Sequence, residues 1–334
     1  MFKTTHAVAN RLGYKAQTLT YLEKIRSTLY ATYTIPKHNG KRREINTYLY
    51  KSKDADLHPA NKVEESRFLA EVHEKINRNI FASLETPDYV MGFKPGISVI
   101  DVAKKHVRKE WVAVLDIKDF FPSVRSNTLM EVLQNRYGFG EMAAWLIARL
   151  VCFRDRLPQG AKTSPMASNI AFVPVDEQIY ELAKIYGFTY TRYADDLIFS
   201  AKEKYTKEEV YEFLDKVKET VQKNGFKVNI DKTKVYHRTQ RQYVLGILVN
   251  KKTNLPKDHK HLLRAMIHNF VVKNRIPFGE DPVRYKRRLL GKVNYLLSIN
   301  KLEQFEKLKR ILSEFKPETV KRWQYLVGKT VAKI

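Results

Sequence analysis

Two adjacent carboxylates, Asp195 and Asp196, stand between two runs of β-branched and aromatic residues. The run at 188–191 reads FTYT and the run at 197–199 reads LIF, which predicts a hairpin whose turn carries both acids. Carboxylates that point to one place repel each other unless a divalent metal ion bridges them. In a strongly basic chain, the natural ligand of such a site is a nucleoside triphosphate carried on magnesium. A solvated turn is the alternative, because Asp is common in turns for its backbone hydrogen bonds.

A third carboxylate, Asp116, follows the apolar run WVAVL at 111–115, which predicts a buried strand. An acid at the end of a core strand needs a partner, and the nearest cation after it is Lys118. If this strand lies beside the hairpin, Asp116, Asp195 and Asp196 form a two-metal site. Such a site activates a primer 3′-hydroxyl and stabilises the leaving pyrophosphate. The three acids therefore indicate a nucleic-acid polymerase.

The composition agrees with this hypothesis and excludes other classes of protein. The 334 residues carry a net charge of +25, which implies a polyanionic partner. We expect no membrane span and no secretory signal, because no long apolar stretch exists and the start reads MFKTTH. The single cysteine, Cys152, lies in an apolar run and predicts core packing, and the nine histidines show no zinc spacing. A reducing cytoplasm is the expected compartment.

The periodicity of the chain predicts an α+β fold, an antiparallel sheet backed by helices. Residues 1–34 are helical in pattern and basic, and residues 35–45 predict a two-stranded hairpin around Asn39 and Gly40. Thr206 and Glu209 form the capping box of one of the predicted helices. The helices are expected at 63–79, 126–150, 171–186 and 206–224.

Three blocks of the chain resemble the central palm motifs of reverse transcriptases, in the right order and at compatible spacing. They read LDIKDFF at 115–121, LPQGAKTSP at 157–165 and YADD at 193–196. The resemblance implies an RNA-directed DNA polymerase, a nucleotidyltransferase that binds dNTPs and uses Mg²⁺, with Mn²⁺ as a possible substitute. It also implies a right-hand fold with an N-terminal extension at 1–34, fingers at 35–110, a palm at 111–250 and a helical thumb at 251–334.

Within that family the chain most resembles the bacterial retron enzymes. The blocks GFKPGISV at 92–99 and AKKH at 103–106 resemble the retron segment ahead of the first palm motif, although Val102 stands where the family has Asn. The block RQYVLGILVN at 241–250 resembles the retron Val-Thr-Gly signature, with Leu245 in place of Thr. The resemblance implies a cognate structured noncoding RNA as template and primer. It further implies a short 2′–5′ branched RNA–DNA product (msDNA) and an anti-phage role with an effector protein.

The motifs also assign roles to single residues. Lys232 is the candidate proton donor to the leaving pyrophosphate, and Phe121 is expected to exclude a ribose 2′-hydroxyl, although either Phe120 or Phe121 could be a core residue. By resemblance, the nucleotide contacts further include Lys37, Arg43, Gln159 and Gly160. The segment resembling the primer grip comprises Tyr243, Val244, Leu245 and Gly246, and His106 belongs to the segment expected to hold nucleic acid.

Basic residues accumulate towards the C-terminus. Residues 251–334 carry 21 Lys and Arg against 7 Asp and Glu, in a helical pattern interleaved with aromatic residues. This asymmetry favours a surface that follows the phosphates of template and primer over an ordinary solvated face. The densest cluster comprises Arg284, Lys286, Arg287 and Arg288.

Other functions remain possible at this point. The chain could be a group II intron, diversity-generating or abortive-infection type of reverse transcriptase. It could also be an RNA-binding scaffold that keeps the fold without catalysis. Three clustered acids argue against the scaffold, because they would repel bound RNA and serve no purpose without a metal ion.

Overall fold

The computed structural model describes residues 1–36, 40, 42–316 and 321–322, of which the last two are described in backbone only. The chain forms two compact units. The first unit comprises Met1–Ile97 and Ala113–Val235, and the second comprises Ser98–Val112 and Tyr236–Ile334. The chain therefore passes between the units three times, and residues 98–112 belong with the C-terminal part of the sequence.

The first unit begins with α1 (Thr5–Leu12), α2 (Ala16–Ile25) and a short 3₁₀ helix, Arg26–Thr28. Strands β1 (Tyr30–Pro36) and β2 (Arg42–Tyr48) then form an antiparallel hairpin, which confirms the predicted pairing around Gly40. The prediction of helix to residue 34 was wrong at its end, because β1 starts at Tyr30. The alternating aromatic and β-branched side chains of YATYTI favour a pleated strand there.

The larger helices of the first unit are α3 (Ala60–Asn79), α6 (Ser126–Asn135), α7 (Glu141–Val151), α8 (Ser164–Ile185) and α9 (Lys207–Lys223). The single helix predicted at 126–150 is two helices. Gly138 adopts φ +66°, and the backbone at Gly140 lies directly against that of Lys3, so no side chain fits there. The capping box of Thr206 and Glu209 at the start of α9 is confirmed. Short 3₁₀ helices at Leu49–Lys51, Ala55–Leu57 and Phe81–Ser83 and the one-turn α5 (Phe120–Ser123) complete this unit.

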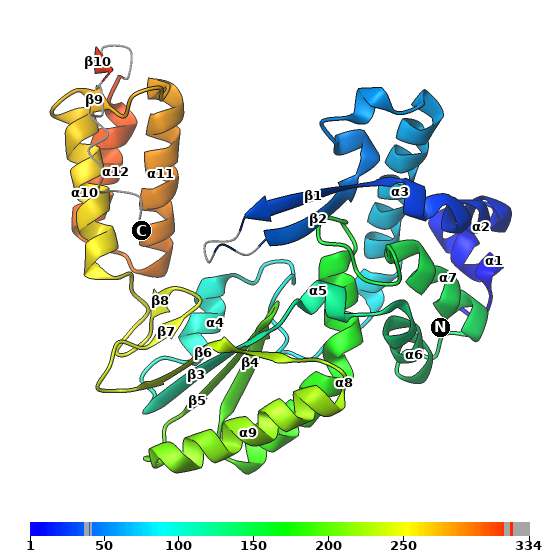
Figure 1. Cartoon of the computed structure of the whole chain (residues 1–334). Helices are drawn as coiled ribbons and strands as arrows, with labels where there is room; N and C mark the ends of the chain where they lie inside the picture. Colours follow the sequence, from blue (N-terminus) through cyan, green and yellow to red (C-terminus); the bar gives the residue numbers. More distant parts are fainter. Residues whose placement is uncertain (37–39, 41, 317–320, 323–334) are drawn as a thin grey trace. The chain divides into compact units, whose positions relative to one another are not determined.

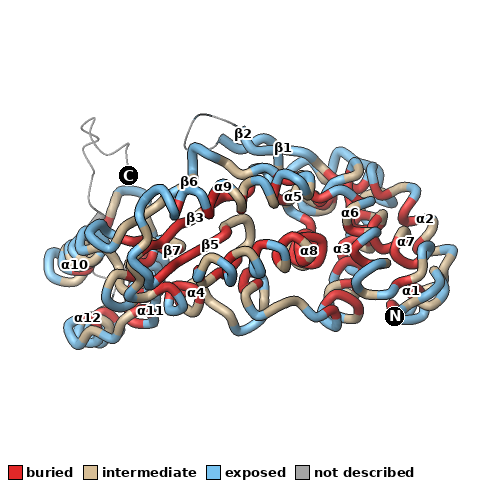
Figure 2. Tube along the Cα trace, turned by 90° about the horizontal axis from the view of Figure 1, so that it is seen from below, coloured by how far each residue is buried: buried red, intermediate tan, exposed pale blue. Residues whose placement is uncertain are grey.

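A four-stranded sheet carries the acidic residues. Its strands are β3 (Trp111–Ile117), β4 (Thr189–Tyr193), β5 (Asp196–Ala201) and β6 (Val228–His237), in the order β4-β5-β3-β6. Helices α8 and α9 cover one face of the sheet (Figure 1). Figure 2 shows that buried residues run along β3, β5 and α8, so the core lies between sheet and helices. The mixed fold confirms the predicted α+β class.

The second unit is mainly helical. It contains α4 (Val99–Lys105), the hairpin of β7 (Tyr243–Val244) and β8 (Ile247–Leu248), and the helices α10 (Lys257–Val271), α11 (Pro282–Ile299) and α12 (Glu303–Glu314). Phe270, Leu289 and Phe305 are fully buried in a common core of the last three helices. Two short strands, β9 (Arg275–Ile276) and β10 (Lys321–Arg322), pair in parallel. Among the described residues, no helix is both long and apolar enough to cross a membrane.

Candidate active site

The turn between β4 and β5 presents the paired acids as predicted. Tyr193 pairs with Asp196 across the hairpin, which leaves Ala194 and Asp195 as the two turn residues. Ala194 adopts φ +55°, a left-handed conformation that two-residue hairpin turns usually give to glycine. Asp195 and Asp196 are both half-buried. The turn is therefore tight, and it holds the two carboxylates next to each other.

The strand that carries Asp116 lies beside this hairpin. Strand β3 is the neighbour of β5 in the sheet, and the amide of Ile117 donates to the carbonyl of Asp195 at 2.8 Å. Asp116 is 8% exposed. The strand of Asp116 therefore lies beside the hairpin, which is the arrangement that a common acidic site requires.

Strand β6 supplies partners to both oxygens of Asp116. Lys232 donates from Nζ to Oδ1 at 2.6 Å, and Asn229 donates from Nδ2 to Oδ2 at 3.3 Å. The sequence singled out Lys232 but missed Asn229, and Lys118, the nearest cation in sequence, is not the partner that donates to this carboxylate. In the part of the chain that the structure describes, no three His, Cys, Asp or Glu side chains converge closely enough to hold one metal ion together.

The electrostatics of the site favour a bound cation. Burial, together with the nearby carboxylates of Asp195 and Asp116, raises the pKa of Asp196 to about 7. Burial also raises the pKa of Asp195, with a further contribution from Asp116. Carboxylate oxygens are the donors that Mg²⁺ and Mn²⁺ prefer, and the excess negative charge is what a divalent ion relieves. The carboxylates of Asp116, Asp195 and Asp196 are therefore donors of the kind that a divalent metal ion prefers, although in the described structure the three side chains do not converge on one point.

A cavity of about 280 Å³ in the first unit brings together residues of β2 and of the loop before α8. It is lined by Arg43 and Gln159, which the sequence assigned to nucleotide binding, and by Arg42. Two further arginines, Arg154 and Arg156, also line it. This pair was not predicted from the sequence, although it stands just ahead of the motif at 157–165. Lys37, the remaining predicted cation of the hairpin, lies outside the described residues.

The loop that carries Gln159 and Gly160 is fixed against the β1–β2 hairpin. The amide of Asn46 donates to the carbonyl of Gln159 at 3.0 Å. A Cβ on Gly160 would lie 2.6 Å from the carbonyl oxygen of Asn46, and the φ of Gly160 is +141°. Only glycine fits this approach, so Gly160 lets the loop pack onto β2.

A buried chain of hydrogen bonds supports the same loop from behind. The amide of Lys162 donates to the hydroxyl of Tyr48 at 2.9 Å, and that hydroxyl bonds to Nδ1 of His73 at 2.7 Å. Nε2 of His73 lies 2.9 Å from the carbonyl of Leu150. The tautomer that satisfies all three contacts carries its proton on Nε2. No local sequence pattern indicates this network, because its members are far apart in the chain.

The two neighbouring phenylalanines have different environments. Phe120 is 5% exposed and packs against the rings of Phe172 and Phe226. Phe121 is half-buried, with its ring centroid 6.0 Å from that of Phe93. The alternative left open by the sequence is thereby decided, since Phe120 is the core residue. Phe121 retains an accessible face for the predicted sugar contact.

The predicted primer-grip segment forms the β7–β8 hairpin of the second unit. Val244 pairs with Ile247, and the turn residues Leu245 and Gly246 both have positive φ, +49° and +80°. His106, in the same unit, is fully buried, and burial lowers its pKa to about 3. The prediction that His106 contacts nucleic acid was therefore wrong for the side chain, because a buried neutral ring does not reach a phosphate.

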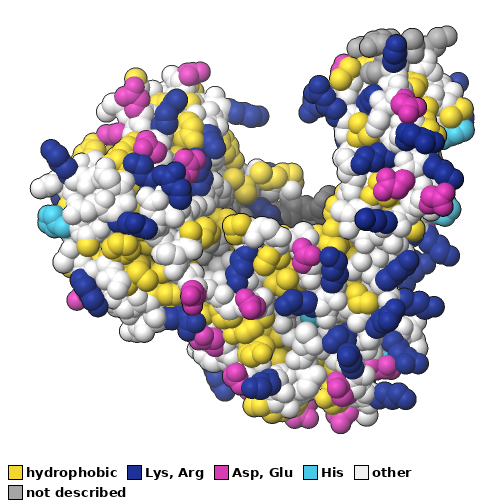
Figure 3. Space-filling view, turned by 180° about the vertical axis from the view of Figure 1, so that it is seen from behind, with side chains coloured by type: hydrophobic (Ala, Val, Ile, Leu, Met, Phe, Trp, Pro, Cys, Tyr) yellow, Lys and Arg dark blue, Asp and Glu magenta, His cyan; other side chains and the backbone are white. Residues whose placement is uncertain are grey.

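The basic cluster on α11 divides into two groups. Arg284 and Arg287 are exposed, whereas Arg288 pairs with Glu280 at 2.7 Å. Lys286 donates to the carbonyls of Ser313 and Phe315, both at 2.7 Å, at the C-terminal end of α12. Lys286 thus caps a helix end, where four carbonyls lack intrahelical partners. Figure 3 shows Lys and Arg side chains spread over the surface of the helices of this unit.

Comparison with known proteins relates the chain to one family. The family model described as Reverse transcriptase (RNA-dependent DNA polymerase) matches residues 35–251, which include the acidic turn and Lys232. The Retron Mx65 reverse transcriptase of Myxococcus xanthus is 30% identical, over 93% of this chain and 71% of that protein. The Retron Mx162 reverse transcriptase of the same species is 33% identical, over 80% of this chain and 58% of that protein. The Retron Ec86 reverse transcriptase of Escherichia coli is 25% identical, over 79% and 77% of the two chains.

Solved structures share the fold at low sequence identity. Telomerase from Candida tropicalis, in complex with a fragment of telomeric RNA, superposes with a TM-score of 0.52 at 12% identity, over 90% of this chain and 59% of that one. The telomerase from Candida albicans gives a TM-score of 0.51, also at 12% identity, over 89% and 58% of the two chains. This likeness concerns the fold alone.

Proposed function

Because this chain belongs to the reverse transcriptase family, and its relatives named above are retron enzymes, we propose that it copies a cognate structured noncoding RNA into DNA. The product is a short 2′–5′ branched RNA–DNA hybrid, primed from an internal guanosine 2′-hydroxyl of that RNA. The observation that carries the proposal is that Asp195 and Asp196 stand on a turn beside β3, the strand that carries Asp116. Lys232 donates to the carboxylate of Asp116. Such a site serves transfer of a nucleotide onto a hydroxyl.

The residues of the chain divide the work of this reaction. Asp116, Asp195 and Asp196 would hold two Mg²⁺ ions, whose chemistry when bound would be to lower the pKa of the primer hydroxyl and to neutralise charge on the triphosphate. Arg43, with the newly found Arg154 and Arg156, lines the cavity where the charge of a triphosphate is best balanced. Lys232 donates a proton to the leaving pyrophosphate. Phe121 excludes a 2′-hydroxyl from the sugar position by collision.

The second unit supplies the surface for template and product. Arg284 and Arg287 are exposed on α11, and the residues from 251 onward carry most of the excess positive charge of the chain. The hairpin of Tyr243–Val244 and Ile247–Leu248 positions the primer 3′ end. The proposed biological role, which the retron resemblance implies, is defence against phage together with an effector protein.

The departures at Val102 and Leu245 bear on the choice among reverse transcriptases. Val102 is fully buried, so an Asn-mediated RNA contact at this position is replaced by core packing. Leu245 is a turn residue with φ +49°, so it stands outside the paired residues of β7 and β8. The nucleic acid that accompanies the protein distinguishes the retron type from the alternatives, which are a group II intron or diversity-generating enzyme, an abortive-infection type and a scaffold that makes no DNA.

The test is to express the protein from its native locus, purify it and sequence the nucleic acid that accompanies it. One short DNA whose mobility shifts after treatment with a 2′–5′ debranching enzyme supports the proposal and reveals the template. Long or heterogeneous DNA contradicts it in favour of an intron or diversity-generating enzyme, and untemplated DNA in favour of an abortive-infection type. RNA without any DNA contradicts it in favour of a scaffold.

Two variants make this result specific to the acidic site. The double substitution D195A/D196A should abolish DNA while RNA remains bound, because the basic surface is on other elements. The matched control is Asp215→Asn on α9, where an exposed carboxylate pairs with its neighbour Lys218. The control should yield the same DNA as the wild type. DNA made by the double variant would refute the assignment of the acids.

A further inference from the structure

A buried ion pair lies beneath the acidic turn and has no role in the site described so far. Arg192, on β4, and Asp176, on α8, are both 0% exposed. The guanidinium binds the carboxylate through two nitrogens, with Nε at 2.8 Å from Oδ1 and Nη2 at 2.7 Å from Oδ2. Tyr190 donates from its hydroxyl to the same carboxylate at 2.6 Å. Asp176 is thus held by three donors and in turn fixes the plane of the guanidinium.

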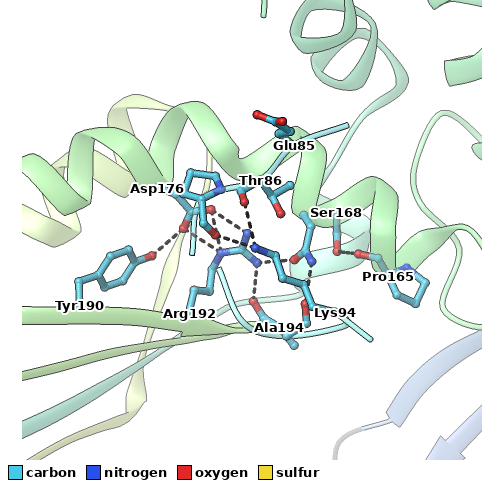
Figure 4. Close-up of polar contacts among 12 residues, drawn as sticks. Glu85, Thr86, Lys94, Pro165, Ser168, Asp176, Tyr190, Arg192 and Ala194 are labelled. Carbon is cyan, nitrogen blue, oxygen red and sulfur yellow. Dashed lines mark hydrogen bonds and ion pairs between the residues drawn. The ribbon is translucent and has the colours of Figure 1, made fainter. Parts of the chain in front are cut away.

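The third nitrogen of Arg192 reaches the turn itself. Nη1 donates to the carbonyl of Ala194 at 3.1 Å, the residue just before Asp195, and to Oδ1 of Asn169 at 3.0 Å. Figure 4 shows the guanidinium between Asp176 on one side and Ala194 on the other. The fork of five donors in Arg allows these contacts to be made at once from one rigid group. The ion pair is therefore tied directly to the backbone of the acidic turn.

Asn169 and Gly92 complete the support. Asn169, which is 4% exposed, donates from Nδ2 to the carbonyl of Gly92 at 2.7 Å. The backbone of Gly92 packs so closely under the turn that an added Cβ would collide with the nitrogen of Ala194. The amides of Met91 and Gly92 also donate to the carbonyl of Arg192, at 2.8 and 3.3 Å. The backbone of Met91 and Gly92 thus supports the turn in addition to the side chain of Arg192.

This support acts on a conformation that the turn does not favour by itself. Ala194 carries a Cβ at φ +55°, in the left-handed region that non-glycine residues rarely adopt. Such conformations persist where the surroundings over-determine them, and they are concentrated at functional sites. The helix that carries Asn169 and Asp176 also begins directly after the loop that lines the nucleotide cavity. One rigid element thus connects the nucleotide loop with the acidic turn.

We propose that Arg192, held by Asp176 and Asn169, is a positioning residue that fixes the turn of Ala194 and Asp195 and so sets the affinity of the acidic site for divalent metal ions. A substitution that loosens this support lets the carboxylates of Asp195 and Asp196 spread, which weakens metal binding. The inference rests on the metal-dependent polymerase activity proposed above. It goes beyond that activity in assigning a role to residues that touch neither substrate nor metal.

The test is Arg192→Lys, because lysine retains the buried charge opposite Asp176 but lacks the planar fork that reaches Ala194 and Asn169. We expect the Mg²⁺ concentration that gives half the maximal rate to rise about tenfold and kcat to fall about tenfold or more, with the KM for template–primer unchanged. Excess Mn²⁺ should restore part of the rate. A variant with wild-type kcat and Mg²⁺ dependence would show that the pair serves only the core.

Two readouts on the free protein separate this inference from the polymerase proposal. Hydrogen–deuterium exchange in Mg²⁺-free buffer should rise in the peptides around 189–197 and around Ile117, whose amide bonds to the turn, and not in α9. Electron paramagnetic resonance of added Mn²⁺ should show weaker binding in Arg192→Lys. If the wild type makes no DNA at all, the polymerase proposal fails, while exchange and Mn²⁺ binding still decide the positioning role.

A matched control is available in the same unit. Arg26 is likewise buried, pairs with Glu23 at 2.8 Å and donates to the carbonyl of Cys152 at 3.2 Å, far from the acids in the sequence. Arg26→Lys should leave the Mg²⁺ dependence unchanged. If Arg192→Lys fails to fold, Asn169→Ala keeps the ion pair and removes the links from Asn169 to Gly92 and to Nη1 of Arg192. Increased Mg²⁺ demand in that variant supports the proposal, and wild-type Mg²⁺ demand overturns it.

Discussion

Lys232 donates to Oδ1 of Asp116 at 2.6 Å, which places the side-chain cation of an edge strand on the most buried of the three acids. The hydrogen bond to Asp116 raises the pKa of Lys232, so the ammonium form persists at neutral pH. The same proton-bearing nitrogen can therefore stabilise the acid and later serve the leaving pyrophosphate. These two roles are separable by substitution.

Lys232→Met should lower kcat by about 10²-fold with little change in the KM for dNTP, because general acids contribute about 10²- to 10⁴-fold. Lys232→Arg distinguishes the roles, because arginine keeps the charge but does not give up its proton. Single-nucleotide incorporation kinetics provide the measurement, and Lys234→Met on the same strand is the control for loss of charge. Full activity of Lys232→Arg would eliminate the proton-donor role and leave only charge stabilisation.

The pH dependence of metal binding follows from Asp196, whose pKa burial and two nearby carboxylates raise from 3.8 to about 7. Mg²⁺ binds the deprotonated acid, so its half-saturating concentration should rise up to about tenfold per pH unit below pH 7. The folded protein holds this proton where the unfolded chain has lost it. The stabilising contribution of the protonated acid is therefore lost as the pH rises from about 4 through 7.

The measurement is thermal unfolding with and without Mg²⁺ at pH 6 and pH 8. The upward shift in Tm caused by Mg²⁺ should be larger at pH 8, and Asp196→Asn should make the shift small at both values. The control is Asp215→Asn, which removes an exposed carboxylate and should behave as the wild type. A shift that does not depend on pH would contradict the raised pKa.

We expect substitutions of the neighbouring residues Phe121 and Phe120 to affect different properties, nucleotide discrimination in the first case and stability in the second. Phe121→Ala should relax the discrimination of dNTP over rNTP by about 10²-fold, because the collision with a 2′-hydroxyl is removed. Phe120→Leu should cost about 1.5 kcal/mol of stability or less and leave the discrimination intact, because its buried ring packs against Phe172 and Phe226 and does not face solvent. The ratio of kcat/KM for the two nucleotides is the readout. Unchanged discrimination in Phe121→Ala would show that another residue selects dNTP over rNTP.

We expect the basic residues of the α11 cluster to differ in their contribution to nucleic-acid binding, as they differ in their contacts in the structure. The double substitution R284A/R287A should weaken binding of a short RNA–DNA hybrid and reduce the slope of log K against log salt by about 1.5 to 2. Lys286→Ala should instead lower the free energy of unfolding by about 1 to 3 kcal/mol, because the carbonyls of Ser313 and Phe315 at the end of α12 lose their donor. Fluorescence anisotropy over a salt series and chemical denaturation measure the two effects. A salt slope as low in Lys286→Ala as in the double variant would make Lys286 a phosphate contact.

Several features of the protein were determined by the sequence alone. The turn with Asp195 and Asp196, the strand before Asp116 and the capped helix starting after Thr206 are specified by residues close together in the chain. Turn chemistry, side-chain alternation and capping act over a few residues, so their signals survive without knowledge of the rest of the fold. Each polymerase motif is likewise a short stretch of sequence, and the order of the motifs is read directly along the chain.

Other features were decided only by the tertiary structure. The split between α6 and α7 depends on Gly140 packing against Lys3, and the different environments of Phe120 and Phe121 depend on α8 and on the segment with Phe93. The burial of His106 and the reach of Arg192 to Ala194 depend likewise on packing. Such contacts join residues from different elements, and a pattern along the chain states which residues prefer burial but not which partners they meet. The tertiary structure alone therefore decided what holds the acidic turn in place.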